Sequence, residues 1–445
     1  METYVPAQPA QQATSPPPGS PAFYDKLLAW LVFLSFFVPG KPQVFIVIPI
    51  CAYWLIRDSL TGRRTQVGRR PVGWALLLSS LYLLQVIALP FTEPAFRPDI
   101  QFNLEQKASL LLLPLVFCCV SDRTKTGIRS QLPVFAYATL FFCLRGNLLY
   151  LTNCGYVAGP TSSVDYRVCF EAMSGLHPTY MGMYLCFSAL ILLMPPAGQP
   201  PLARGPLGAL LLLLFLCLLA LIPKAPIIGL MFALGYYAWQ HRNRRDNITF
   251  VAGTWAGALV LAYLFIPFLK QRIDEIASVS QPLPDNHPAA TSMTMRHLIW
   301  TIDQNLWRDH WLTGVGPGRL KAALEAQYAY YSRVYGHALE YYDTHNEYLN
   351  QWLSFGLIGI ALFAVVLLVQ FGRAFAQRDS LYVALLLLLT TVFFTENVLS
   401  VQQGVVFYAL FTSLFFFDRW QSGHPPTKKG TEAPSLVVDA ATAPR

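Results

Sequence analysis

Long runs of apolar residues recur along the whole chain, and they constrain its fold more than any other feature of the sequence. Many of them approach the ~20 residues that a helix needs to cross the hydrocarbon core of a bilayer. The 445 residues are 54% hydrophobic and 13% charged, against roughly 25% charged residues in soluble domains. Backbone polar groups inside a bilayer must bond to one another, which favours helices. The sequence therefore predicts an all-α, polytopic membrane protein.

We expect about twelve transmembrane helices, with one large polar loop between the ninth and the tenth. This organisation predicts a disordered N-terminal tail, nine helices, a loop with amphipathic helices, three more helices and a disordered C-terminal tail, over residues 1–25, 26–269, 270–347, 348–420 and 421–445. The expected spans cover residues 27–38, 44–56, 72–89, 108–120, 132–151, 179–194, 207–222, 225–239, 248–269, 348–371, 381–398 and 405–417.

The distribution of basic residues predicts the orientation, because short cytoplasmic loops carry more Lys and Arg than external ones. One alternate set of loops is rich in arginine, and we expect it in the cytoplasm together with both tails. The polar segment 270–347 then faces outward. The outward set of short loops holds only Lys41, Arg97, Lys107, Arg167 and Lys224, whereas the arginine-rich set holds Arg57, Arg63, Arg64, Arg69, Arg70, Arg123, Lys125, Arg129, Arg204, Arg242, Arg244, Arg245, Arg373 and Arg378.

The net charge and the cysteines exclude two classes of function. The charge of +8 does not indicate a nucleic-acid partner, because the arginines lie in short loops between apolar runs. The eight cysteines have no metal-ligand spacing, so we expect no metal site. Cys154 and Cys169 share a polar loop, where a disulfide and two free thiols both remain open. The other cysteines lie in apolar runs and are expected to be small buried residues.

The stretch from Asp343 to Gly359 joins the large polar loop to the tenth expected helix. Thr344-x-x-Glu347 has the pattern of a capping box, which predicts His345 as the first helical residue. A histidine at a helix N-terminus near the membrane surface is disfavoured as a cation. His345 is therefore a candidate neutral base.

Two basic residues are candidates for binding a phosphate. Arg296, close to Trp300, could be an interfacial anchor or a bidentate holder of a lipid phosphate. Lys224 lies in Ile222-Pro-Lys-Ala-Pro226 between two apolar runs. It could extend to the outer headgroups, or it could line a concave site that the two prolines open.

Three further polar residues lie at the expected outer ends of spans. Arg145 is inside an apolar run, so it should have an anionic ligand or a partner. We favour an ion pair with Glu171 or Asp165. His177 precedes a proline at a helix start, where it could serve as a cap or act in function. Glu396 could cap a helix, pair with a cation or act in catalysis.

The segment Gly314-Val-Gly316-Pro-Gly318 superficially suggests a phosphate cradle. However, no strand precedes it and no Gly-Lys-Ser/Thr follows it, which argues against nucleotide binding. We expect a tight turn between two amphipathic helices that lie on the membrane.

In combination, these motifs resemble the O-antigen ligase and polymerase superfamily. The resemblance rests on His345-Asn346 followed by Gly356-x-x-Gly359, on the segment from Thr291 to Trp300, on the glycine turn and on the topology of nearly the whole chain. It implies a metal-independent integral-membrane glycosyltransferase without a cofactor, acting at the periplasmic face of the bacterial inner membrane. The donor would be a glycan on undecaprenyl diphosphate. The acceptor would be lipid A–core in a ligase, or another lipid-linked repeat in a polymerase.

The resemblance also suggests roles for individual residues. It implies that His345 is the base for the acceptor hydroxyl and that Arg296 holds the diphosphate. Lys224 stands where the family commonly has an arginine. A one-step displacement would invert the anomeric carbon, and the sequence offers no obvious carboxylate nucleophile for a double displacement. The substrate-binding candidates are Arg296, Lys224, Asn346, His177, Arg145 and Glu396.

We favour a ligase over a polymerase because the outer loop is single and compact. A protein O-oligosaccharyltransferase is disfavoured because the segment after Trp420 is short, polar and Pro-rich. A flippase or transporter of lipid-linked glycans would carry ionisable residues along a path between spans. The polar residues that could carry chemistry here gather at the outward face instead. The expected partners are therefore the lipid-linked donor, the glycolipid acceptor and membrane lipids, with no nucleic acid.

Overall fold

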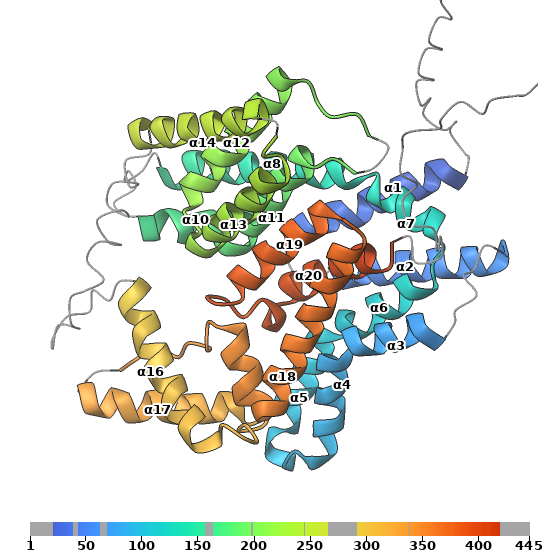
Figure 1. The fold of residues 1–445 in the computed structure, drawn as a ribbon. Coiled ribbons are helices and arrows are strands. Elements are labelled where there is room, and N and C mark those ends of the chain that lie inside the picture. The colour runs from blue at the N-terminus through green and yellow to red at the C-terminus, as the bar shows by residue number, and fades with distance from the viewer. Residues whose placement is uncertain are drawn as a thin grey trace, which may run out of the picture.

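The computed structural model describes residues 21–38, 43–62, 69–155, 163–196, 199–243, 245–265, 292–336 and 338–418, and all regular elements in them are helices (Figure 1). The all-α prediction is confirmed for this part of the chain. The expected C-terminal tail and most of the N-terminal tail lie outside the described residues. Helix α1 begins at Pro21, so residues 21–25 are helical and do not belong to a disordered tail.

The helices of the first half are α1 (Pro21–Leu34), η1 (Ser35–Phe37), α2 (Gln43–Leu60), α3 (Arg69–Leu78), α4 (Ser80–Ala88), η2 (Leu89–Phe91), η3 (Pro94–Phe96), α5 (Arg97–Lys107), α6 (Ser109–Cys119), α7 (Asp122–Arg129), α8 (Leu132–Tyr150) and the π-helical turn η4 (Leu151–Gly155). Those of the second half are α10 (Ser163–Ser174), α11 (Pro178–Leu193), α12 (Arg204–Leu221), α13 (Lys224–Gln240), α14 (Arg245–Phe265), α16 (Ser292–His310), α17 (Leu320–Tyr335), α18 (Glu347–Ala376), α19 (Ser380–Val392), η6 (Val398–Ser400) and α20 (Gln402–Phe416).

Each expected span coincides, in whole or in part, with a helix or a helix pair. Among the described residues, six helices are long and apolar enough to cross a membrane, and the number rises to eight if each of two bent pairs is one span. In one such pair, α3 and α4 meet at 65° within the expected span 72–89. The apolar helices α19 and α20 are shorter. The number of twelve spans therefore stays a prediction.

Helices α11, α19 and α20 form the centre of the bundle, as Figure 1 shows for α19 and α20. Every residue of α11 is buried, and so is every residue of α20 from Gly404 onward. A helix can be buried on all sides only if other helices surround it. Helix α14, in contrast, exposes large apolar side chains such as Val260 and Leu264. That exposure fits a surface in contact with lipid.

Helices α18, α19 and α20 run between two clusters of polar side chains. At one end, an arginine cluster consists of Arg57, Asp58, Arg129, Asp379 and Asp418. Arg129 Nη1 lies 2.6 Å from Asp379 and 2.7 Å from Asp418. Asp379 caps the start of α19, and Asp418 follows the end of α20. The other end of these helices holds the candidate site.

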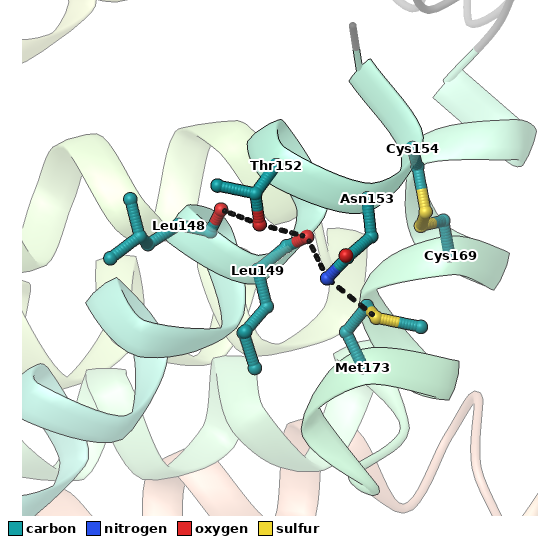
Figure 2. The surroundings of a disulfide bond; sticks show 7 residues. All are labelled: Leu148, Leu149, Thr152, Asn153, Cys154, Cys169 and Met173. Atoms are coloured by element: carbon teal, nitrogen blue, oxygen red, sulfur yellow. Dashed lines mark hydrogen bonds between the residues drawn. A yellow bond between two sulfur atoms is a disulfide. The ribbon is translucent and has the colours of Figure 1, made fainter. Parts of the chain in front are cut away.

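A disulfide joins Cys154, in the π-helical turn η4, to Cys169 on α10 (Figure 2). This outcome settles the alternative that the sequence left open. In the same turn, Asn153 Nδ2 donates to Leu149 O at 3.0 Å and to Met173 Sδ at 3.6 Å. The disulfide and the Asn153 contact therefore hold η4 against α10.

The glycine-rich turn between α16 and α17 packs into a kink of α18. Gly356 has φ +63° and ψ −148°, which are not helical values, and a Cβ there would collide with Leu312 O. Leu357 N–H donates to Leu312 O at 3.1 Å, and Val315 N–H donates to Leu353 O at 2.7 Å. The expected tight turn between two helices is confirmed, and its glycines allow two backbones to approach closely.

Candidate functional site

His345 lies in a sharp turn immediately before α18. Its φ is +44°, a left-handed conformation that is uncommon for a residue with a side chain. The predicted capping box is wrong, because the N-cap is Asn346, whose side-chain oxygen accepts from Leu349 N–H at 3.1 Å. His345 is therefore outside the helix, and the first helical residue is Glu347.

The turn is bonded to the segment that follows α19. Asn397 Oδ1 accepts from the Thr344 hydroxyl at 2.9 Å and from Asn346 N–H at 2.8 Å. Glu347 N–H donates to Phe393 O at 2.8 Å. The Thr344 hydroxyl also donates to Asn346 O at 3.2 Å, so at this turn it is a donor and not the N-cap acceptor of α18. These bonds fix His345 relative to residues 393–397, and they hold a backbone conformation that would otherwise be unfavourable.

Glu396 connects His345 to the start of α11. Its Oε2 lies 3.4 Å from His345 Nδ1, and its Oε1 accepts from the Thr179 hydroxyl at 3.4 Å. His177 caps α11 through Nδ1, which accepts from Thr179 N–H at 3.3 Å. Burial lowers the pKa of His177, and the charge of Glu396 opposes that shift. Glu396 is buried, whereas the His345 side chain is 33% exposed, so a substrate can reach the imidazole.

Lys224 and Glu396 line one cavity of about 30 Å³, together with Thr179 and Arg167. A volume of this size holds one or two water molecules. Lys224 is the first residue of α13 and is half-buried. The left-handed residue Ile222 and Pro223 separate it from α12. We call His177, Lys224, His345 and Glu396 the histidine cluster.

The structure places the other sequence candidates differently. Arg145 is exposed on α8, on the same face as the exposed residues Phe141, Leu144 and Leu148. The structure therefore does not bring Arg145 into the histidine cluster. Arg296 belongs to α16, but its side chain lies outside the part that the structure describes.

Sequence reasoning overlooked the buried polar residues behind His345. Glu347 is fully buried, and both of its carboxylate oxygens accept hydrogen bonds, one from Gln351 at 2.7 Å and one from Leu399 N–H at 2.9 Å. Asn397 and Lys107 are also buried. Glu347 had a sequence signal in the supposed capping box, and Asn397 had one beside Glu396 at the end of an expected span, but neither signal pointed to a partner of the His345 turn.

Comparison with known proteins finds a family that part of the chain resembles. A family model described as O-antigen ligase matches residues 209–364. The match supports membership of the O-antigen ligase superfamily. This superfamily consists of glycosyltransferase-like ligases and polymerases that act on lipid-linked glycans and lipid A–core. Together with the apolar helices, it indicates a multi-pass membrane protein. No curated protein matches the chain.

The O-antigen ligase match covers only part of the candidate site. Residues 209–364 include Lys224, Arg296 and His345. His177 and Glu396 lie outside the matched range, and the fold brings them to His345 from α11 and from the end of α19. Both were candidates from the sequence, but their proximity to His345 rests on the structure and not on the family match.

Proposed function

We propose that this protein is an O-antigen ligase of the bacterial inner membrane, transferring a glycan from undecaprenyl diphosphate to a hydroxyl group of lipid A–core at the periplasmic face. The observation that carries the proposal is the pairing of His345 with Glu396 at 3.4 Å. It supports a base whose ring is oriented by a buried carboxylate and remains accessible to a substrate.

In the proposed reaction, Nδ1–H of His345 donates to Glu396, which leaves the lone pair of Nε2 for the acceptor hydroxyl. Nε2 removes the hydroxyl proton as the acceptor oxygen bonds to the anomeric carbon. The bond between that carbon and the diphosphate oxygen breaks, and undecaprenyl diphosphate leaves with the electron pair. The Glu396 carboxylate stabilises the imidazolium that forms. A single displacement of this kind inverts the anomeric carbon and requires no metal.

Cations are assigned to the donor diphosphate. Lys224 lines the same small cavity as Glu396, the partner of His345. Because that cavity is too small for a diphosphate, we place the phosphates at its opening, where the half-buried lysine can reach them. Arg296 is assigned as a second cation from its motif. Positive charges fixed at the leaving group stabilise the transition state more than the ground state. Asn346 contributes by capping α18 behind the base.

Replacement of His345 by alanine tests the proposal. We expect His345→Ala to abolish glycan transfer while the protein inserts normally into the membrane, because the substitution removes only a partly exposed side chain. His310→Ala, at an exposed histidine of α16, is the matched control and should be fully active. Normal transfer by His345→Ala would refute the assignment.

Deletion of the gene distinguishes a ligase from its alternatives. A ligase mutant should have lipid A–core without attached chains and should accumulate long lipid-linked polymer. Single repeats on the core would indicate a polymerase instead. Donor retained on the inner leaflet would indicate a flippase.

A further inference from the structure

Arg167 of α10 lines the same cavity of about 30 Å³ as Lys224 and Glu396, and the proposed reaction gives it no role. Because one or two water molecules would fill this cavity, the side chains that line it face one another across a small space. Arg167 and Lys224 are cationic and Glu396 is anionic, so the described lining carries one more positive charge than negative. The opening of the cavity therefore favours an anionic group.

An arginine adds to this site something that Lys224 does not supply. A guanidinium group is a planar fork of donors that binds two phosphate oxygens at once, whereas an ammonium group acts as a point charge. Arg167 is half-buried, so part of its side chain remains accessible to a ligand at the opening. Cations from two different helices, α10 and α13, can then contact the two phosphates of one diphosphate.

Contacts with α8 hold α10 in place beside the cavity. The Phe170 ring packs so closely on Gly146 of α8 that a Cβ there would lie 2.7 Å from a ring carbon. The Tyr166 hydroxyl, next to Arg167 in the chain, donates to Asn147 Oδ1 of α8 at 2.5 Å. Helix α10 meets α11 at 76°. It therefore crosses the end of α11, and α8 supports it there.

The disulfide between Cys154 and Cys169 fixes the turn of α10 that carries Arg167 (Figure 2). Cys169 is two residues after Arg167, and Cys154 belongs to η4, which follows α8. Disulfides persist in oxidising compartments such as the bacterial periplasm, which agrees with the outward orientation expected for this loop. Both cysteines are half-buried, so a reductant in solution can reach them. Loss of the covalent link would allow this turn to withdraw Arg167 from the cavity.

We propose that Arg167 is a further cation for the diphosphate of the donor, and that the disulfide between Cys154 and Cys169 holds it at the opening of the cavity. This inference rests on the proposed function, since it assumes a diphosphate beside Lys224. Arg167 lies outside the residues that match the O-antigen ligase family model, so its assignment comes from the cavity and from the packing of α10.

Binding of undecaprenyl diphosphate to the purified protein in detergent tests the role of Arg167. We expect Arg167→Met to weaken binding about 10- to 100-fold, because it removes a charge-assisted contact with the phosphates. Arg167→Lys should lose less affinity, since it keeps the charge and loses only the fork. Arg333→Met, at an exposed arginine of α17, is the matched control and should bind as wild type does.

A second experiment removes the disulfide. It uses Cys154→Ser/Cys169→Ser and, separately, wild type reduced to two thiols by dithiothreitol, which is itself oxidised to a cyclic disulfide. The other six cysteines are free thiols, so this disulfide alone is reduced. We expect either change to weaken binding about tenfold. Adding Arg167→Met to the cysteine variant should give the same affinity as Arg167→Met alone, because the disulfide acts through that arginine.

Other results would overturn the inference. Unchanged binding by Arg167→Met would remove Arg167 from the site, and if that variant does not accumulate, wild-type affinity of Arg167→Lys would do the same. Unchanged binding after reduction, or a triple variant clearly weaker than Arg167→Met, would mean that the disulfide does not act through Arg167. Wild-type protein that fails to bind undecaprenyl diphosphate would instead refute the proposed function itself.

Discussion

The arginine cluster and the histidine cluster lie at opposite ends of α18, α19 and α20, and they use charged side chains in contrasting ways. In the arginine cluster, charges meet at hydrogen-bond distance, as between Arg129 and its two aspartates at 2.6 and 2.7 Å. In the histidine cluster, His345 and Glu396 are 3.4 Å apart, and the imidazole is 33% exposed. One set of groups is closed by its own contacts, and the other remains open to a ligand.

This contrast indicates where stability and where activity should reside. A buried ion pair with well-made contacts is destabilised strongly when one partner is removed. A partly exposed base with one long contact contributes little to stability, so its replacement should affect mainly the reaction. We therefore expect substitutions at the two ends to have separable effects, on the amount of folded protein at one end and on turnover at the other.

The largest effect is expected from Arg129→Met. The Arg129 side chain is 14% exposed, and those of Asp379 and Asp418 are 8% and 4% exposed. Its removal leaves two buried carboxylates without their cation, which should cost about 3–5 kcal/mol in the free energy of unfolding. Thermal unfolding in detergent measures the loss, and Arg123→Met, at an exposed position of α7, is the control. A variant of normal stability would contradict the structural role of the cluster.

Glu396→Gln should reduce turnover by about 100-fold or more. The amide retains the shape of the side chain but cannot stabilise the imidazolium of His345 by charge. We expect the thermal midpoint to remain close to that of wild type. Glu325→Gln, at an exposed position of α17, provides a control for loss of a carboxylate. Turnover within about twofold of wild type would exclude Glu396 from the catalytic pair.

The sequence predicted the all-α fold class because the length of the apolar runs and the scarcity of charged residues are local properties of the chain. Length alone did not reveal that α3 and α4 meet at 65°, because the break depends on how neighbouring helices pack. The kink at Gly356 was equally hidden. Its position depends on the turn that contains Leu312, which lies 44 residues earlier in the chain.

The candidate site was predicted in part, for a related reason. His345 and Lys224 were found from local patterns at helix boundaries, and the structure brings both to the surroundings of Glu396. The partnership of Glu396 with His345 spans 51 residues, so no local pattern could show it. The capping-box prediction failed because Asn397, also distant in sequence, bonds to Thr344 and sets the turn.

Asp303 on α16 differs from the acids of both clusters, because it is buried and has no hydrogen-bond partner among the described residues. Burial and the charge of Asp343 raise its pKa well above the usual value. The folded protein therefore holds a proton that the unfolded chain releases, so stability falls as pH rises above the ordinary aspartate pKa of about 4. We expect Asp303→Asn to raise stability at neutral pH and to flatten this dependence, as measured by unfolding between pH 4 and 8. A lower stability at pH 7 would show that the acid is ionised and paired.

The smallest effect is expected from Arg319→Ala, which removes an exposed counterpart of the Arg129 pair. Arg319 Nη1 lies 3.2 Å from Glu93 Oε1, with side chains 54% and 59% exposed, and the guanidinium carbon lies 5.5 Å from the Phe96 ring centroid. Water already solvates both charges, so the loss should be no more than about 1 kcal/mol with unchanged turnover. Arg319 and Arg129 both pair with carboxylates beside a phenylalanine ring, but Arg129 meets two carboxylates and both are buried. A loss much smaller than that of Arg129→Met is therefore expected, and equal losses would mean that the buried arginine cluster contributes no more to stability than the exposed surface.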